Sequence, residues 1–247
     1  VNKIYTVIPC AGSGSRAGGD KAKQYQQIRG KPMIFYTLDA ILELKVIEHC
    51  LLVVAPHDRE MKQLIEQHPL HSKSFDRLSV EPIGGHTRAQ SVLAGLKALM
   101  GIGASAQDWV LVHDAARCLV QAPWVQQLID ACQDDDVGGI LAWPVSDTLK
   151  SSQGDSIQTT LERADKWLAQ TPQMFKLGPL IEAIEAGSDL MTDESSAMEA
   201  QGLRPKLVKA SALNIKITYP DDFLLADAVL AARAGQHSQS INPSIDL

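Results

Sequence analysis

Several features that would place a chain outside the ordinary globular class are scarce or missing in this sequence. Aromatic residues make up only 5% of its 247 residues. The apolar runs, such as residues 51–55, are far shorter than the roughly 18–20 residues that cross a bilayer. No basic segment followed by an apolar stretch opens the chain, so we expect no secretory signal. We therefore expect neither a membrane-spanning nor a secreted protein.

Positive charge is also in short supply. The chain has 23 Lys and Arg residues against 29 Asp and Glu residues, a net charge of -6, and so lacks the overall basic field of a nucleic-acid-binding protein. The four cysteines (Cys10, Cys50, Cys118 and Cys132) contain no CxxC pair, which suits reduced thiols. With 45% hydrophobic residues, a chain of this length folds without a disulfide or metal staple. We expect a cytoplasmic globular protein without nucleic-acid or membrane partners.

Short apolar runs alternate with amphipathic stretches along most of the chain. Strands are predicted over residues 3–8, 50–55, 78–83, 109–113, 138–142, 206–209 and 215–218. Helices are predicted over residues 32–44, 59–67, 87–100, 123–132, 178–186, 193–201 and 220–233. Apolar strands separated by helices are typical of a parallel sheet covered on both faces. The sequence therefore predicts a three-layer, doubly wound, mostly parallel α/β fold, with ligands at the carboxyl ends of the strands.

Residues 145–174 break this pattern. Polar alternation surrounds a turn-like segment at residues 151–155, which predicts a protruding β-hairpin. A hairpin with few apolar residues is not stable alone, so we expect this arm to pack on a partner subunit. We expect a single domain over residues 1–235 that carries the arm, followed by a mobile polar tail over residues 236–247.

A glycine-rich segment directly after the first predicted strand is the strongest candidate site. In residues 9–16, glycines allow backbone N–H groups to approach phosphate oxygens. Arg16 and Lys23 supply the positive charge that an oligophosphate requires. A Walker A loop is excluded, because residues 20–22 do not provide the Lys-Ser/Thr pair after Gly19. The segment therefore predicts an anion site of another kind.

Three interpretations of this segment remain open. Residues 12–17 formally match a dinucleotide-binding fingerprint, but the second strand ends at residues 55–57 without the expected acid. The second interpretation is a βα turn that needs glycine only for its geometry, but it would leave Arg16 and Lys23 unexplained. The third interpretation is a nucleotidyltransferase loop wrapped around the triphosphate of a nucleotide.

Seven motifs follow one another along the chain. They are residues 11–16 with Lys23-Gln24-Tyr25, residues 84–96, residues 113–117, Asp147-Thr148, Thr171-Pro172-Gln173, Thr192-Asp193-Glu194 and residues 214–218. Together they resemble the 2-C-methyl-D-erythritol 4-phosphate cytidylyltransferase family over nearly all of residues 3–230. The resemblance implies a Rossmann-like nucleotidyltransferase fold and transfer of CMP from CTP to the polyol phosphate, with release of pyrophosphate, in non-mevalonate isoprenoid biosynthesis. It also implies a homodimer with exchanged arms, and Mg²⁺ bound mainly through the CTP phosphates.

The resemblance also implies roles for individual residues. The catalytic residues would be Arg16, Lys23, Arg163 and Lys216, with Arg163 reaching the neighbouring subunit's site from the arm. The substrate-binding residues would be Ala11, Gly12, Gly14, Gly85, Ser91, Asp114, Ala115, Thr148 and Thr192, with no metal ligand from the protein. Because both substrates are anions, catalysis should rest on positioning and charge stabilisation. A phosphate monoester is largely ionised at neutral pH, so no general base is required.

Some positions depart from the family pattern or suggest a structural role. His86 stands where the family often has Asp, and Ala22 where Pro is usual. We expect His113 to be a hydrogen-bonded structural residue, Arg117 to orient its turn through a salt bridge, and Cys10 to be inert packing. Two other functions remain open: a cytidylyltransferase for another sugar-alcohol phosphate, such as ribitol 5-phosphate, and a non-catalytic nucleotide-binding regulator that kept the fold.

Overall fold

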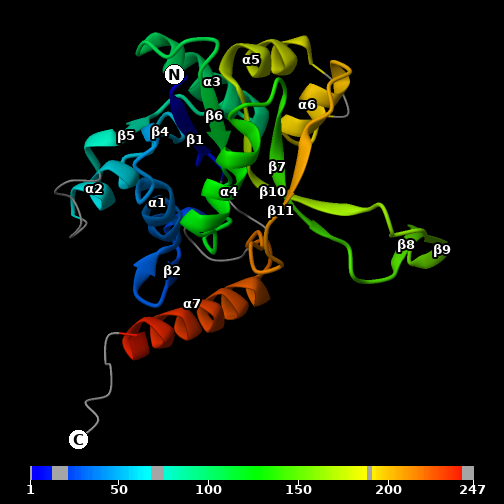
Figure 1. The fold of residues 1–247 in the computed structure, drawn as a ribbon. Coiled ribbons are helices and arrows are strands. Elements are labelled where there is room, and N and C mark those ends of the chain that lie inside the picture. Colours follow the sequence, from blue (N-terminus) through cyan, green and yellow to red (C-terminus); the bar gives the residue numbers. More distant parts are fainter. Residues whose placement is uncertain (1, 13–21, 68–74, 188–190, 241–247) are drawn as a thin grey trace, which may run out of the picture.

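The residues that the computed structural model describes, 2–12, 22–67, 75–187 and 191–240, form a seven-stranded sheet with helices on both faces (Figure 1). In spatial order its strands are β11 (Lys206–Lys209), β7 (Gly138–Pro144), β10 (Trp167–Lys176), β6 (Trp109–Val112), β1 (Ile4–Pro9), β4 (Ile47–Val53) and β5 (Leu78–Glu81). Only β10 runs antiparallel to its neighbours in this described sheet. The predicted mostly parallel α/β sheet is confirmed.

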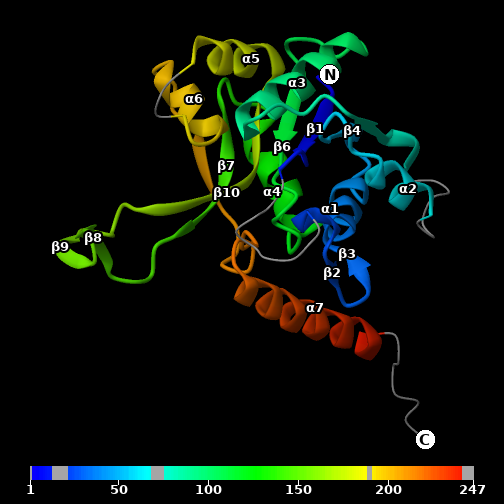
Figure 2. The same ribbon diagram turned by 180° about the vertical axis from the view of Figure 1, so that it is seen from behind.

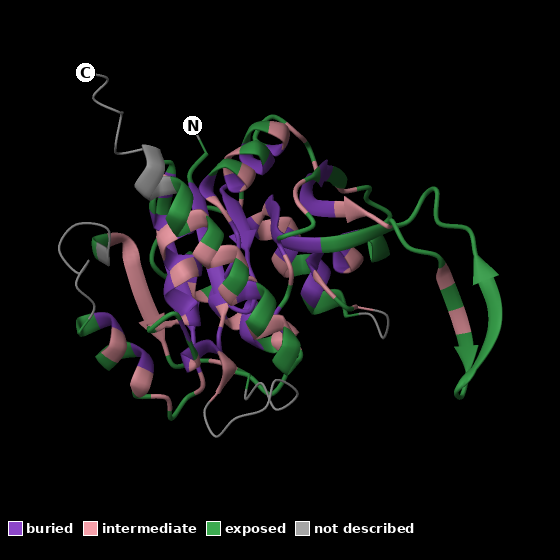
Figure 3. Cartoon of the chain, turned by 90° about the horizontal axis from the view of Figure 1, so that it is seen from below, coloured by how far each residue is buried: buried purple, intermediate pink, exposed green. Residues whose placement is uncertain are grey.

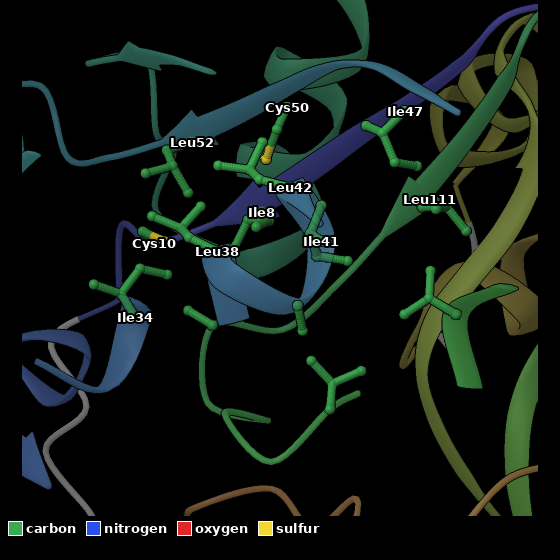
Figure 4. Packing of buried hydrophobic residues seen from close by; sticks show 14 of the residues in the cluster. Ile8, Cys10, Ile34, Leu38, Ile41, Leu42, Ile47, Cys50, Leu52 and Leu111 are labelled. Carbon is green, nitrogen blue, oxygen red and sulfur yellow. The ribbon is translucent and has the colours of Figure 1, made fainter. Parts of the chain in front are cut away.

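Two apolar clusters, one on each face of the sheet, account for the layers. One cluster holds residues of α1 (Met33–Leu42), α2 (Glu60–Glu66) and α4 (Ala122–Cys132), and the other holds residues of α3 (Arg88–Gly101), α5 (Leu177–Ala186) and α6 (Glu194–Ala200). Along β1, Ile4 and Ile8 belong to the first cluster, whereas Tyr5 and Val7 belong to the second. Figure 4 shows part of the first cluster. Because both faces of the strand are buried, the three-layer prediction is confirmed.

Helix α3 begins where the sequence predicts. The Thr87 side chain accepts a hydrogen bond from the backbone N–H of Gln90, and the Gln90 side chain accepts one from the backbone N–H of Thr87. This reciprocal capping box satisfies two backbone donors that the helix leaves unpaired. It also fixes the direction in which the chain enters α3 from the glycines before it.

The strand predicted over residues 215–218 is wrong. In the structure this segment is irregular. The Ile217 N–H donates to the carbonyl of Ala116 (2.8 Å), and the Ile217 carbonyl accepts from the Lys23 ammonium. Since a side chain takes the place of a neighbouring strand's backbone, the alternating sequence pattern does not lead to a β-ladder here.

An arm of the chain, residues 145–166, reaches away from the body (Figures 1 and 3). Within it, β8 (Leu149–Gln153) and β9 (Ser156–Leu161) pair as a separate antiparallel sheet around Gly154, whose φ is +58°. The predicted boundary at residue 174 is wrong, because β10 starts at Trp167 and joins the central sheet. Met174 and Phe175 are fully buried there, and this burial holds the returning strand in the body.

The C-terminal helix α7 (Pro220–Ser240) runs beneath the small hairpin of β2 (Gln27–Ile28) and β3 (Lys31–Pro32) (Figure 2). A third apolar cluster that includes Met33, Ile217 and Ala226 lies between them. The expected tail begins later than predicted, because residues 236–240 continue α7, and residues 241–247 lie outside the described residues. The described residues also form the short 3-10 turns η2 (Lys23–Tyr25) and η3 (Phe75–Arg77). No helix among those described is long and apolar enough to span a bilayer.

Helix α3 approaches the sheet closely at Gly95. A Cβ atom there would lie 2.7 Å from Val53 Cγ2 and 2.8 Å from Val7 Cγ1. We predict that Gly95→Ala lowers the free energy of unfolding by about 1–3 kcal/mol, the usual cost of overpacking a core. Gly101→Ala is the matched control, because nothing lies within 4 Å of the added methyl group in the same helix. Urea unfolding would contradict the prediction if Gly95→Ala were as stable as the control.

Candidate active site

A cleft opens at the edge of the sheet where β1, β4, β5 and β6 end. These strands are parallel, so their carboxyl ends lie together. The cleft has a volume of about 300 Å³. The described residues that line it are 9–12, Lys23, Gln24, Met33, 85–88, Ser91, 114–116 and Lys216. Ligands of open α/β sheets bind at this edge.

Many of the predicted site residues meet in this cleft. They are Ala11, Gly12, Lys23, Gly85, Ser91, Asp114, Ala115 and Lys216. Thr192 lines a neighbouring cavity of about 210 Å³, which shares Arg88, Asp114 and Lys216 with the cleft. Thr148 and Arg163 belong to the arm and do not line the cleft. Gly14 and Arg16 lie outside the described residues.

The turn before α3 brings backbone to the wall of the cleft. The Gly84 N–H donates to the Val54 carbonyl (2.8 Å), and a Cβ atom on Gly84 would lie 2.7 Å from that oxygen. The Gly85 N–H donates to the hydroxyl of Ser91 (3.1 Å), which donates to the Thr87 carbonyl (3.0 Å). Ser91 is buried, and its hydroxyl holds the turn in place where both Gly85 and Ser91 line the cleft.

A chain of four charged side chains lies between the cleft and the neighbouring cavity. Asp114 follows β6, and its Oδ1 accepts from Arg88 Nε (2.7 Å) while its Oδ2 accepts from Lys216 Nζ (2.7 Å). The two terminal nitrogens of Arg88 donate to the two carboxylate oxygens of Glu194, at 2.6 and 2.9 Å. Such two-pronged pairs are among the strongest hydrogen-bonded ion pairs in proteins. The four formal charges cancel.

The pKa values of the linked side chains follow from burial and ion pairing. Burial would raise the pKa of the Asp114 carboxyl, but the charges of Arg88 and Lys216 outweigh it and hold that pKa well below its usual range. Burial would likewise lower the pKa of the Arg88 guanidinium, but Glu194 and Asp114 raise it above its ordinary value. Both groups are therefore charged at neutral pH.

The sequence alone assigned no role to Arg88 or Glu194. Both residues lie inside two of the seven motifs, but they are 106 positions apart in the chain, so their pairing is not visible in the sequence. One signal in the sequence could have pointed to Arg88. It is an arginine placed directly after a predicted N-cap, where a positive charge opposes the helix dipole and so needs a partner.

His113 is part of a hydrogen-bonded connection behind Asp114. The Asp114 N–H donates to the Thr171 hydroxyl (3.0 Å), which lies 3.1 Å from His113 Nδ1, and His113 Nε2 lies 3.3 Å from the Arg117 carbonyl. Burial lowers the pKa of His113 to about 4. The imidazole is therefore neutral at physiological pH, with Nδ1 accepting and Nε2 donating.

The loop that carries Lys216 is fastened by hydrogen bonds to its backbone. Arg117 donates to the carbonyls of Asn214 (2.6 Å) and Ala169 (3.0 Å), and the Asn214 amide donates to the carbonyl of Thr171 (3.0 Å). The salt bridge expected for Arg117 is wrong in kind, because this guanidinium binds carbonyl oxygens. It orients the turn by joining two loops to β10.

Lys23 reaches the cleft from the opposite wall. It opens the turn η2, which Gln24 fastens to the end of β1 by donating to the Cys10 carbonyl (2.8 Å). The Lys23 ammonium donates to the Ile217 carbonyl, next to Lys216. The segment after β1 and the loop before α7 therefore meet across the cleft. Burial raises the pKa of the Cys10 thiol far above its usual range, so this cysteine is not a nucleophile.

Carboxylates are sparse in the cleft. Among its described lining residues only Asp114 carries one, and both of its oxygens already bind cations. Within the described residues no group of three or more His, Cys, Asp or Glu side chains could hold a metal ion. Magnesium is commonly bound by one or two carboxylates together with substrate phosphates and water. This donor set fits an ion carried on a triphosphate better than one held by protein ligands alone.

Comparison with known sequences identifies relatives along almost the whole chain. The profile of a family described as 2-C-methyl-D-erythritol 4-phosphate cytidylyltransferase matches residues 4–232. A protein of that name from Cupriavidus pinatubonensis is 44% identical over 250 residues, which cover 97% of this chain and 98% of that protein. A bifunctional IspD/IspF enzyme from Albidiferax ferrireducens is 53% identical over 236 residues, which cover 96% of this chain but only 55% of that enzyme. The chain thus spans about half the length of the bifunctional relative.

Solved structures share the fold. A 4-diphosphocytidyl-2C-methyl-D-erythritol synthase matches with a TM-score of 0.81 at 34% identity, covering 93% of this chain and 99% of the other. The 2-C-methyl-D-erythritol 4-phosphate cytidylyltransferase of Francisella tularensis matches with a TM-score of 0.75 at 32% identity, covering 91% and 98%. Family profile, full-length relatives and solved structures agree with the resemblance of the seven motifs. The chain belongs to the 2-C-methyl-D-erythritol 4-phosphate cytidylyltransferase family.

Proposed function

We propose that this chain transfers CMP from CTP to 2-C-methyl-D-erythritol 4-phosphate in isoprenoid precursor biosynthesis. The products are 4-diphosphocytidyl-2-C-methyl-D-erythritol and pyrophosphate. One observation carries the proposal: in a member of this family, Lys23, Lys216 and the Gly85 turn surround one cleft at the carboxyl edge of the sheet. Lysine ammonium groups are what a reaction between two phosphates needs, because the main obstacle is charge repulsion.

The reaction is an in-line substitution at the α-phosphorus of CTP. An oxygen of the substrate phosphate forms the new P–O bond, while the bond to the β-phosphate oxygen breaks and pyrophosphate leaves with the electron pair. The Lys23 and Lys216 ammonium groups neutralise the charge on the reacting phosphates and hold them in line. No residue has to accept a proton, because the attacking monoester is already largely ionised. His113, with a pKa near 4 and both ring nitrogens engaged, is not such a base.

The two cavities provide a place for each substrate. CTP occupies the cleft beside the Gly85 turn, and the polyol phosphate occupies the neighbouring cavity, which Arg117, Thr171 and Thr192 line. Lys216 lines both cavities, so its ammonium lies between the attacked and the attacking phosphate. A cation at that point favours bond formation, because it offsets the repulsion where the two anions approach each other.

Magnesium enters the proposal as a companion of CTP. When bound, the ion adds positive charge to the triphosphate, as in other phosphoryl-transfer enzymes. Its binding through the phosphates is supported by the engagement of both Asp114 oxygens with cations. The protein's own part is to hold the nucleotide through Lys23 and the backbone around Gly12 and Gly85, which line the cleft.

We also propose a homodimer in which each arm completes the partner's site. Ile157 and Leu161 leave 69% and 45% of their surface exposed, although a hairpin without its own core needs apolar contacts to be stable. A cavity of about 560 Å³ at the base of the arm, lined by Trp143 and Trp167, lies beside Lys216. Arg163 donates to the Ser146 carbonyl within the arm. The arm itself reaches away from the body of the subunit (Figure 1). In a dimer, Arg163 of the partner subunit would bind the polyol phosphate.

The proposed location is the cytoplasm. The four cysteines are buried and form no disulfide among the described residues. Reduced thiols suit a reducing compartment. The proposed substrates are water-soluble phosphates, so a cytoplasmic enzyme would meet them in solution.

The substrate is tested by measuring pyrophosphate release from CTP and Mg²⁺ with 2-C-methyl-D-erythritol 4-phosphate and, in parallel, ribitol 5-phosphate. We expect release with the branched tetritol phosphate alone. Release only with the ribitol compound would keep the mechanism and change the substrate. Absence of release with both, from folded protein that binds CTP in a calorimeter, would favour the nucleotide-binding regulator.

The role of Lys23 is tested by Lys23→Ala. We expect turnover to fall by at least about a hundredfold, the scale of losing one preorganised contact to developing charge. Lys97→Ala is the matched control, because the Lys97 side chain is 56% exposed on α3 and pairs with Glu185. Circular dichroism spectra should show all three proteins folded. Near-normal turnover of Lys23→Ala would refute the role.

The exchanged arm is tested by mixing two inactive variants, Lys23→Ala and Arg163→Ala. In a mixed dimer one site combines an intact Lys23 with Arg163 of the partner subunit, so we expect activity to return when subunits exchange. Exchange is verified by mass spectrometry of differently labelled subunits. Mixed dimers no more active than either parent would contradict arm exchange.

A further inference from the structure

Arg88 has an unusual place for an arginine. It is the first residue of α3, and a positive charge at the N-terminus of a helix is unfavourable because that end of the helix dipole is already positive. Helix stability therefore does not explain it. Its side chain is only 28% exposed and is directed at two carboxylates that are themselves buried. The energetic reason for Arg88 must come from those partners.

The contacts of Arg88 use the shape of the guanidinium. Nε donates a hydrogen bond to Asp114, and the two terminal nitrogens donate to Glu194. One planar group therefore joins two carboxylates from different parts of the chain. A lysine ammonium carries the same charge but cannot reproduce this fork. Asp114 is the first link towards Lys216, because its other oxygen accepts one of the three N–H bonds of the Lys216 ammonium.

Glu194 connects this chain to the wall of the neighbouring cavity. It is the first residue of α6, directly after Thr192 and Asp193, which line that cavity. Asp193 caps the helix, and Gln173 of β10 donates to Asp193 Oδ2 (2.8 Å) and accepts from the Ser195 N–H (2.8 Å). The start of α6 is therefore rigid, and Arg88 is joined to a fixed point of the fold.

We propose that Arg88 and Glu194 are positioning residues that set the Lys216 ammonium, through Asp114, relative to the turn that carries Thr192. Lys216 lies on an irregular loop, and its side chain is 42% exposed, so its own surroundings do not define where the ammonium lies. If Lys216 were its only partner, the Asp114 carboxylate would be free to move together with that lysine. Because its other oxygen accepts from Arg88, which is paired with Glu194, Asp114 is a fixed anchor for the Lys216 ammonium. The proposal rests on the proposed function, because it concerns the phosphates that Lys216 aligns.

The test separates alignment from binding. In Glu194→Gln the two-pronged ion pair is lost while the shape of the side chain is kept. We expect kcat to fall about ten- to hundredfold, because misplacement of a reacting group by about 1 Å costs that much. The KM for CTP should change less than about twofold, since CTP contacts Lys23 and the Gly85 turn in the cleft. Arg88→Lys keeps the charge but loses the planar fork of the guanidinium. It should give the same fall in kcat with the same small change in the KM for CTP.

Two further variants make the result specific. In Arg88→Lys/Glu194→Gln the loss of kcat should not exceed that of Arg88→Lys alone, because groups that act as a unit are not additive. Asp135→Asn is the matched control, since it breaks an ion pair with Lys206 (2.6 Å) at the start of β7, the opposite edge of the sheet from the cleft. This control should keep the wild-type kcat.

The outcomes distinguish this proposal from the proposed function. An active wild-type enzyme whose Glu194→Gln and Arg88→Lys variants both keep kcat within about twofold would overturn the positioning role alone. A wild-type chain that transfers no CMP would overturn the proposed function and this inference with it. If Glu194→Gln does not fold, Arg88→Lys decides, because it retains a positive charge between the two carboxylates. An equal loss of kcat in Asp135→Asn would also refute the proposal, because the loss of any ion pair would then be enough to lower kcat.

Discussion

The site depends on one electrostatic constraint: a carboxylate removed from water has to be paired. Asp114 lies at the end of a central strand with 7% of its surface exposed, so its charge requires the cations on either side of it. Arg88 comes from a helix on one face of the sheet, and Lys216 comes from the loop before the last helix. This single carboxylate therefore joins three segments that are far apart in the chain.

The same constraint prepares the site for anions. Asp114 and Glu194 balance the charges of Arg88 and Lys216, and a backbone carbonyl accepts a hydrogen bond from the Lys23 ammonium. In the proposed reaction, phosphates that enter the cleft would meet cations whose positions are already defined, so little reorganisation would be needed when they bind. The glycine turn lines the cleft with backbone, without side chains that would fill the space. Positioning and charge thus replace a covalent nucleophile.

The arm follows a different rule from the rest of the fold. Its two strands pair only with each other, and most of their residues are exposed in the single chain (Figure 3). The body, in contrast, buries both faces of its sheet. An exposed apolar surface is stabilised when a second copy covers it, and this supports the proposal that the site is divided between the cleft of one subunit and the arm of another.

The sequence by itself determined the layers, the cap of α3 and the glycine turns beside the cleft, because these features follow from local periodicity and from residues a few positions apart. It also identified the family, since the seven motifs occur in order. Only the tertiary structure decided that Arg88 joins Asp114 to Glu194, that β10 returns from the arm into the sheet, and that residues 215–218 are irregular. Each of these depends on which distant groups neutralise a charge or accept a hydrogen bond, and such pairing exists only once the chain has folded.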